Sequence, residues 1–401
     1  MNLLFVEGIS PACFDTEGNA YVGSDLQGAV VQRYKNVCDK LTILTKTNGE
    51  VYSPSEIPSG RYLLDKNIAD LVTVPNLYRP RSNFLSLKVR RRIIDIMSEA
   101  IQKADGVLMR IAMNYNGVMA EKLCRKFHKP YCIQSVDCPF DMYWHGGIEA
   151  KIIAPFYEIM FKRMMRRAPY ALYVTGDYLQ RRYPTNGKSI DCSDVDIRAL
   201  DSNTLEKRIE HIHSSRTGKV IFGTLAMITK SKGHKYVIEA LAKLRTGGGL
   251  RNLEYRIAGN NYRGYDKYLM NLAKSLHVDD IVRFDGHLEH DKVFEWLDEL
   301  DVYIQPSFQE GLCRALVEAM SRALPVMSSN AGGNYEIVAQ EMIFKAGNPG
   351  QIAEIMQKMM NPEVQEREAR RSFTRAHDFE KEKLDRKRNE FYSEFTGVRH
   401  W

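Results

Sequence analysis

The sequence has no apolar run long enough to cross a membrane, since no stretch of its 401 residues approaches ~18 uninterrupted apolar positions. It begins MNLLFVEGIS, which contains neither a basic region nor a long apolar core, so we expect no signal peptide. The seven cysteines are scattered and form no C-x-x-C pair, which argues against a disulfide framework or a zinc knuckle. Cysteines used in this way are typical of a reducing compartment. We therefore expect a cytoplasmic protein.

Two common phosphate-binding motifs are also missing. The P-loop pattern fails because Arg182 stands where the first glycine before 187–189 is required, and no G-x-G-x-x-G follows a predicted strand. The pair Asp194 and Asp196 resembles the D-x-D that binds a divalent cation in some nucleotide-sugar enzymes. Two carboxylates alone are a weak pattern for a hard metal. We expect neither a metal nor another cofactor.

What is present is the composition of an ordinary globular protein, 44% hydrophobic and 27% charged, with a length that suits two or three domains. Residues 1–200 carry 27 Lys+Arg against 21 Asp+Glu, whereas residues 201–401 carry 30 against 29. The basic first half indicates either contact with an anionic surface or ligand, or only a solvated basic face. We expect no nucleic acid partner.

Short apolar runs alternate with amphipathic helical patterns throughout, which predicts βαβ units around parallel sheets buried on both faces. The polar stretch 191–219 interrupts this alternation. The prediction is an α/β protein of two doubly wound domains, 1–197 and 198–378, facing each other across a cleft at the carboxyl ends of their strands. A charged helix over 379–401 is expected to pack back on the first domain. The predicted strands are 3–6, 41–44, 71–74, 106–113, 130–136, 171–176, 219–226, 253–259, 281–286, 302–307, 325–329 and 342–347.

The segment 305–333 carries the strongest chemical signal. A predicted strand ends in a loop with Glu310 and Gly311, and a helix with one apolar stripe follows. Such a loop presents free backbone N–H groups and the positive end of the helix dipole, which favour a bound anion. Arg314 opposes that dipole unless it contacts a phosphate. The alternative is an ordinary ion pair of Arg314 with Glu318.

A second basic loop follows the predicted strand 219–226. Its Lys230 and Lys232 would point into the cleft, where they could neutralise a diphosphate, although a solvated basic loop is the alternative. In the first half, Gly23 and Ser24 form a flexible segment able to approach a substrate. The basic amphipathic helices 85–104 and 148–170 suit either an anionic lipid surface or ordinary coverage of a sheet.

At 305–333 the sequence closely resembles the retaining glycosyltransferases of family 4, which have the GT-B fold of two Rossmann-like domains. Their Glu-x₇-Glu signature is present as Glu310 and Glu318. The resemblance extends over about 219–350. The first half resembles members tied to bacterial surface-polysaccharide and capsule assembly, through the segments 129–147 and 168–184.

The resemblance implies transfer of a sugar from a UDP- or GDP-sugar to a hydroxyl of a glycan or lipid-linked acceptor, with retention at the anomeric carbon and without a metal. Glu310 should contact the donor sugar, Glu318 the ribose hydroxyls, and Lys232 (or Lys230) the leaving phosphate. Peripheral contact with the inner face of the cytoplasmic membrane would suit such an acceptor. The remaining donor-site residues implied are Thr224, Gly259, Gly311, Leu312, Cys313 and Arg314.

Three positions depart from the family pattern. Thr224 replaces a frequent arginine, and Cys313 replaces a proline and adds an amide donor. Asp137 stands where many members have a histidine near the sugar, with His145 farther along in the cleft, and Asp137 is the candidate to take that catalytic place. We expect front-face displacement with the leaving phosphate as base. The alternatives are a nucleotide-sugar epimerase on a similar scaffold and an inactive nucleotide-sugar-binding protein.

Overall fold

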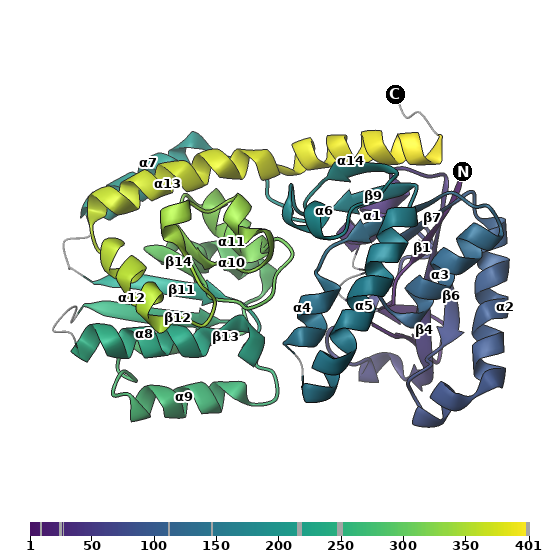
Figure 1. The fold of residues 1–401 in the computed structure, drawn as a ribbon, viewed down its shortest axis with the longest axis horizontal. Coiled ribbons are helices and arrows are strands. Elements are labelled where there is room, and N and C mark those ends of the chain that lie inside the picture. Colours follow the sequence, from purple (N-terminus) through teal and green to yellow (C-terminus); the bar gives the residue numbers. More distant parts are fainter. Residues whose placement is uncertain are drawn as a thin grey trace.

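The structure is a computed structural model, and it describes residues 1–8, 10–23, 26, 28–110, 113–145, 147–214, 219–246 and 252–397. Two α/β units, each built around its own sheet, lie side by side in Figure 1. The first sheet uses residues between Asn2 and Asp191, and the second uses residues between Val220 and Phe344. The α/β prediction with two sheets is confirmed.

In the described part of the chain, the first sheet has ten strands in the order β10-β9-β8-β7-β1-β4-β2-β3-β5, with β6 paired to β4. Its core from β10 to β6 is parallel, because βαβ connections return each strand in the same direction. The strands are β1 (Asn2–Val6), β2 (Ala12–Asp15), β3 (Ala20–Val22), β4 (Lys40–Tyr52), β5 (Tyr62–Leu63), β6 (Asp70–Pro75), β7 (Gly106–Arg110), β8 (Tyr131–Ser135), β9 (Tyr170–Tyr173) and β10 (Lys188–Asp191).

Helices of the first unit cover this sheet with one apolar face each. Helix α2 is capped by Ser86, whose side chain accepts from the Val89 amide, and it buries a stripe of Ile93, Met97 and Ile101. Most of α2 is therefore a sheet-covering helix, which was one of the two interpretations of 85–104. The helices are α1 (Gly28–Lys35), α2 (Leu87–Lys103), α3 (Tyr115–Lys126), α4 (Pro139–Trp144), α5 (Ile148–Arg167) and α6 (Tyr178–Arg182).

The second sheet is parallel, in the order β13-β12-β11-β14-β15-β16. Its strand order reverses between β11 and β14, which is the switch point where open α/β sheets bind ligands. Its strands are β11 (Val220–Leu225), β12 (Leu253–Ala258), β13 (Val282–Gly286), β14 (Val302–Gln305), β15 (Val326–Ser329) and β16 (Ile343–Phe344). Its helices are α7 (Ser202–Ser214), α8 (His234–Thr246), α9 (Tyr265–Ser275), α10 (Val293–Asp298), α11 (Arg314–Ser321), α12 (Pro349–Lys358) and α13 (Pro362–Ala376).

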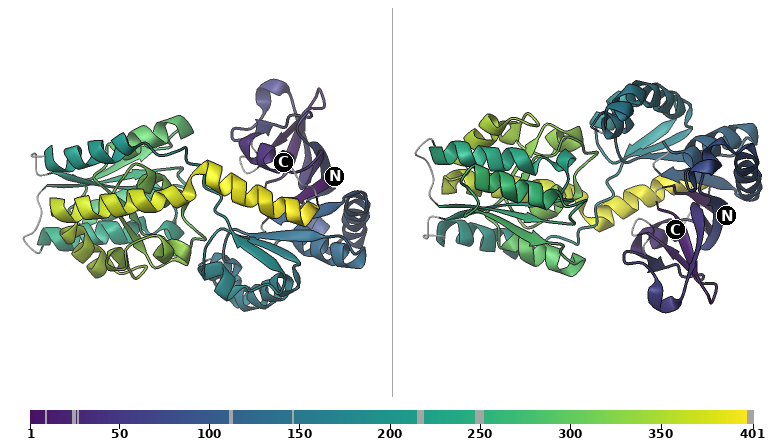
Figure 2. Two further views of the ribbon diagram at one scale, coloured as in Figure 1. Left: turned by 90° about the horizontal axis from the view of Figure 1, so that it is seen from above. Right: turned by 90° about the horizontal axis from the view of Figure 1, so that it is seen from below.

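Each predicted strand has a counterpart, but four short strands were not predicted: β2, β3, β5 and β10. Strands β3 and β5 join the sheet antiparallel, with β3 pairing β2 and β5 pairing β3. Figure 2 shows the segment that contains them, in purple, standing off to one side of the parallel core. None is longer than four residues, so none carries the apolar run by which buried strands are recognised.

The last helix, α14 (Lys381–Thr396), crosses from the second unit to the first (Figure 1). Its Arg388 is fully buried, where it pairs with Asp385 at 2.6 Å and donates to the Ser193 carbonyl at 2.7 Å. The chain passes between the units at two adjacent places, because the Lys381 amide donates to the Ile197 carbonyl at 2.9 Å. The predicted boundary at 197/198 lies at the first of these crossings.

Candidate active site in the interdomain cleft

Two loops meet at the switch point of the second sheet. The loop after β11 carries Lys232, the loop after β14 carries Glu310, and the Lys232 Nζ donates to the Glu310 Oε1 at 2.6 Å. Although burial pulls the pKa of Lys232 down, the Glu310 carboxylate raises it above its ordinary value. The Lys232 ammonium is thus held in its charged form and already faces the Glu310 side chain.

Backbone geometry brings the lysine loop against the end of β14. A 3₁₀ turn over Lys230–Lys232 ends at Gly233, whose φ of 75° lies in the left-handed region. A Cβ at Gly233 would collide with the carbonyl oxygen of Pro306. The Phe308 amide also donates to the Ser231 carbonyl at 2.8 Å. This packing directs Lys232 toward Glu310, whereas Lys230 is exposed and does not line the cavity around Glu310.

Glu310 is also held from its own strand. The Gln305 Nε2 donates to the Glu310 Oε1 at 3.0 Å, and the Tyr303 hydroxyl donates to the Gln305 Oε1 at 2.7 Å. Sequence reasoning did not single out Gln305, although it begins the quoted 305–333 segment. Because the positions of Gln305 and Glu310 depend on buried partners, the Glu310 carboxylate is oriented before any ligand arrives.

Lys232 and Glu310 open into a cavity of about 490 Å³ between the two units. Three cations line it (Arg110, Lys232 and Arg314), together with four carboxylates (Asp137, Asp194, Glu310 and Glu318). The other lining residues are Val136, Val174, Ser193, Leu225, Ala226, Met227, Gln305, Gly311, Leu312, Cys313 and Ala315. The structure therefore brings together Glu310, Lys232 and Asp137, which were the three candidate catalytic residues, with most of the candidate donor-site residues.

Asp137 enters the cavity from the loop after β8, on the side opposite Glu310. Burial, and then the nearby Glu310 carboxylate, raise the pKa of Asp137 from its ordinary value of 3.8 to about 6, against the opposing effect of the three cations. Asp137 therefore changes its charge closer to neutral pH than an ordinary aspartate does. A further anion in the cavity would favour its protonated form.

The raised pKa of Asp137 makes a prediction about stability. The folded protein binds a proton at Asp137 more tightly than the unfolded chain does, so this residue costs stability above pH 6 and the cost fades as the pH falls toward 3.8. Asp137→Asn should raise the free energy of unfolding by about 1–3 kcal/mol near pH 8 and by about half as much near pH 5. Urea denaturation at the two pH values measures this difference. The exposed Asp279→Asn is the control, and an equal gain at both pH values would contradict the assignment.

The start of α11 completes the cavity. Cys313 is the N-cap residue of α11, and Gly311 lies so close to the first unit that a Cβ there would collide with the Val136 carbonyl. The Cys313 amide donates to the Asn334 Oδ1 at 3.3 Å. The amide donor that Cys313 adds in place of a proline thus contacts a buried side chain in this structure. Arg314 and Glu318 both border the cavity.

Arg110 and Asp194 form a pair that sequence reasoning missed. The Arg110 side chain at the end of β7 donates to the Asp194 Oδ2 at 2.8 Å, and Arg33 of α1 lies 3.6 Å from the other Asp194 oxygen. Burial opposes the charge, but these arginines lower the pKa of Asp194. Asp196 pairs instead with Lys381 at 3.1 Å. The two carboxylates of the D-x-D pattern therefore pair with different cations, and they are neighbours only in the sequence.

The remaining candidates lie outside the cavity lining. Thr224 is buried within the sheet, where its hydroxyl donates to the Ile304 carbonyl at 2.8 Å and accepts from Tyr255. Gly259 follows β12 with a φ of 140°, and a Cβ there would collide with the carbonyl of cavity-lining Ala226, so its role is to let two loops approach.

His145 contacts Phe308 across the cleft, with ring centroids 5.5 Å apart. Gly23 directly follows β3, and Ser24 is outside the described residues.

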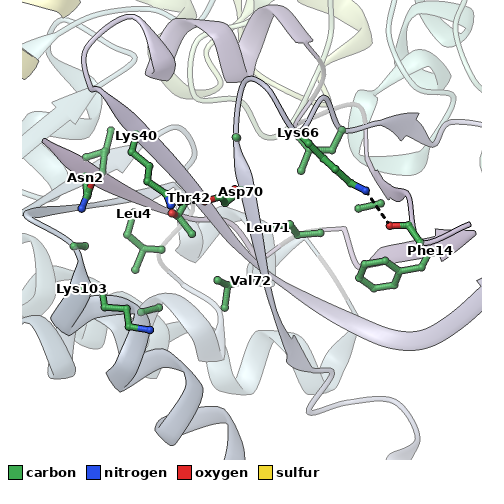
Figure 3. Close-up of a pocket in the computed structure, with 17 residues that line it drawn as sticks. Asn2, Leu4, Phe14, Lys40, Thr42, Lys66, Asp70, Leu71, Val72 and Lys103 are labelled. Carbon is green, nitrogen blue, oxygen red and sulfur yellow. Dashed lines mark hydrogen bonds and ion pairs between the residues drawn. The ribbon is translucent and has the colours of Figure 1, made fainter.

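A larger cavity of about 780 Å³ lies at the opposite, amino-terminal edge of the first sheet (Figure 3). Figure 3 shows its lysines at the rim, and each has a partner. Lys40 pairs with Asp70 at 2.8 Å, Lys103 pairs with Glu99 at 2.6 Å, and Lys66 donates to the Gly18 carbonyl. Its interior is formed largely by Leu4, Leu71 and Val72. It lacks the converging charges of the interdomain cavity.

Comparison with known proteins finds a family model and curated proteins with similar sequences. Residues 206–377 match the family model described as glycosyl transferases group 1. The chain is 31% identical to protein CapJ of Staphylococcus aureus over 86% of this chain and 83% of that protein. It is 26% identical to a putative colanic acid biosynthesis glycosyltransferase, WcaL, of Salmonella typhimurium, over 49% of this chain and 48% of that protein.

Solved structures show the same fold. Anabaena HepE in complex with UDP superposes with a TM-score of 0.66 at 15% identity, covering 98% of this chain and all of that one. A sucrose-phosphate synthase from Thermosynechococcus elongatus gives a TM-score of 0.71 at 12% identity, with both chains fully covered. The predicted GT-B architecture, two Rossmann-like domains facing across a cleft, is thereby confirmed.

Proposed function

Because this chain belongs to the group 1 glycosyltransferases, we propose that it is a retaining, metal-independent enzyme that transfers a sugar from a nucleotide diphosphate sugar to a hydroxyl of a growing surface polysaccharide. WcaL supports the process, since it is named as a putative colanic acid biosynthesis glycosyltransferase. Structures of Anabaena HepE with UDP and with UDP-glucose support a UDP-sugar donor, and a GDP-sugar is the alternative.

The observation that carries the proposal is the charged pair of Lys232 and Glu310, which faces Asp137 across the cavity. A sugar diphosphate bound there would place two phosphates near Lys232, Arg314 and the start of α11, where positive charge collects. Its sugar would then lie between Glu310 and Asp137. Glu318, four residues into α11, is placed to accept hydrogen bonds from the ribose hydroxyls.

The transfer itself breaks the bond between the anomeric carbon and the diphosphate oxygen, and that bond's electrons leave with the diphosphate. Lys232 and Arg314 stabilise this charge, while the Glu310 carboxylate stabilises the positive charge that develops on the sugar ring. The acceptor oxygen attacks from the face that the diphosphate leaves, so configuration is retained. Its proton passes to the departing phosphate oxygen. Asp137 contributes a contact to the sugar from the first domain.

These cations supply the charge that a divalent metal supplies in other sugar transferases, so we expect turnover to continue in the presence of a chelator. The acceptor is proposed to be a lipid-linked glycan, which would place the enzyme on the inner face of the cytoplasmic membrane. Among the residues that the structure describes, no helix is both long and apolar enough to span a bilayer.

A thermal-shift screen against UDP, GDP and their sugars tests the proposal. A nucleotide that binds the cavity should raise the melting temperature when its concentration is far above its Kd. At 100 times the Kd, the bound ligand adds about 2.7 kcal/mol to the free energy of unfolding. The matching nucleotide sugar should then release nucleoside diphosphate when a glycan acceptor is added. Thr224→Ser, inside the sheet, is a control that should leave both readings unchanged.

The outcomes separate the alternatives. A new sugar formed from the donor alone, without an acceptor, would identify a nucleotide-sugar epimerase. Binding without turnover over a broad acceptor panel would identify an inactive binding protein. If no nucleotide shifts the melting temperature, the assignment of the cavity as a donor site fails.

A further inference from the structure

Helix α5 exposes a stripe of large apolar side chains on its outer face. Ile148 is 82% exposed, Ile152 75%, Phe156 65% and Ile159 50%. Their spacing places them within roughly a quarter of the helix circumference. The opposite face of α5 buries Ala154, Phe161, Met164 and Met165 in the core. We call the exposed residues the α5 stripe, and its contrast with α2, whose apolar stripe is buried, shows that sheet coverage does not account for it.

A second group of exposed apolar residues lies at the start of α2. Phe84 is 47% exposed, Leu85 83% and Leu87 81%, and together they form what we call the 84–87 turn. Each group has an aromatic pair beside it. Tyr78 stacks on Phe84 with centroids 6.0 Å apart, and Tyr157 of α5 stacks on Tyr143 at 4.2 Å.

Both groups lie at the same edge of the molecule. Helices α2 and α5 begin after the parallel strands β6 and β8, so their first turns lie at the carboxyl edge of the first sheet. Figure 1 shows these first turns on the lower side of the first domain. Asp137 and Arg110 reach the interdomain cavity from this same carboxyl edge. A surface that contacts the α5 stripe therefore lies beside the mouth of the cleft.

Most charges around these residues are basic, although α5 itself also carries an exposed Glu149 and a Glu158 that pairs with Lys162 at 3.0 Å. Residues 78–92 contain six Lys or Arg and no Asp or Glu, and Arg79, Arg81, Lys88, Arg91 and Arg92 are exposed. The last two turns of α5 add exposed Lys162, Arg163, Arg166 and Arg167. Trp144, which is 42% exposed, stacks on Phe140 and lies under the Lys151 ammonium at 5.8 Å. Apolar and aromatic side chains flanked by cations are the composition of helices that lie in the interface of an anionic bilayer.

We propose that the α5 stripe and the 84–87 turn form a membrane-docking surface that inserts into an anionic lipid bilayer and holds the cleft opening at the headgroups. This inference rests on the proposed function, because it supplies the route by which a lipid-linked acceptor reaches the cavity. A protein partner fits this surface less well than a bilayer does. One face of such a protein would have to neutralise many cations and also cover the exposed isoleucines.

Co-sedimentation of the full chain with vesicles tests the proposal. One set of vesicles is phosphatidylcholine alone, and the other is equal parts phosphatidylcholine and phosphatidylglycerol. The protein should sediment with the anionic vesicles, and salt at about 0.5 M should weaken that binding by screening. The double variant Ile152→Asp, Phe156→Asp should lower the apparent affinity by at least about tenfold, because two charges then meet the acyl boundary. Met270→Asp, at an exposed position of α9 in the other domain, is the matched control.

Two further measurements make the result unambiguous. Vesicle binding should shift the tryptophan emission to the blue, and Trp144→Phe should remove most of that shift. A double variant that binds as the unmodified chain does would overturn the proposal, as would a dimer in solution that the double variant dissociates. UDP and GDP thermal shifts on the same variants report the donor site separately, so loss of vesicle binding with retained nucleotide binding concerns this surface alone.

Discussion

Replacing Glu310 with glutamine is expected to lower the turnover number for the nucleotide sugar by about 10²–10³-fold, with a smaller change in donor affinity. Glutamine keeps the shape of the side chain and its reach to Lys232 and Gln305, but it removes the negative charge that faces the sugar. That charge matters most when positive charge develops on the ring, so the effect belongs in kcat rather than in KM. The rate of nucleotide release at a saturating concentration of the donor measures kcat directly.

The matched control for Glu310→Gln is Glu295→Gln, because Glu295 is an exposed carboxylate that also pairs with a lysine, Lys292, at 2.9 Å. This change should leave turnover within about twofold, since surface ion pairs contribute little. If Glu310→Gln turned over at the rate of the unmodified enzyme, Glu310 would have no part in the chemistry and the Lys232–Glu310 pair would be only structural.

The second large effect is expected at Lys232. Lys232→Met should lower kcat/KM by about 10²–10³-fold and should also weaken nucleoside diphosphate binding, because the lysine meets the phosphates in both the bound and the reacting states. It should also release Glu310 from its 2.6 Å partner, so the double variant with Glu310→Gln should lose less than the two single effects combined. Isothermal titration with UDP or GDP separates the binding component from the chemical one.

Lys230→Met provides a control two residues away on the same turn. Lys230 is exposed and does not line the cavity, so its replacement should leave kcat/KM nearly unchanged. Equal losses at the two lysines would mean that the loop acts through its net charge instead of through one oriented ammonium group. Lys232→Arg should recover part of the binding but less of the rate, because its planar group cannot occupy the same point.

The sequence predicted the parallel core because the apolar runs of buried strands are local patterns. It also predicted that Lys232 and Glu310 share a face, because both follow the carboxyl end of a strand in the same sheet. Their direct contact could not be derived from spacing alone, since 78 positions separate them. The strands β2, β3 and β5 escaped because their pairing is set by tertiary packing and their own sequences are too short to show a period.

Site details that depend on distant partners were also beyond the sequence. The Cys313 amide is taken by Asn334, which comes from another loop, and Arg110 is turned toward Asp194 by a contact across 84 positions. Helical periodicity identified both α2 and α5 as amphipathic. Which of the two buries its stripe depends on how each lies on the sheet, and local periodicity carries no information about that.

The pairing of the two interdomain crossings has a mechanical consequence. The Lys381 amide bonds to Ile197, so both covalent links between the domains pass through one small region, and any rotation that separates the domains must pivot there. On the cleft side, Glu336 of the second domain accepts hydrogen bonds from the Gly176 and Tyr178 amides at 2.6 and 2.8 Å. These bonds join the second domain to the loop that follows β9 in the first domain. Any separation of the two domains at the cleft must therefore break these polar contacts, while the paired crossings keep the domains joined at one place.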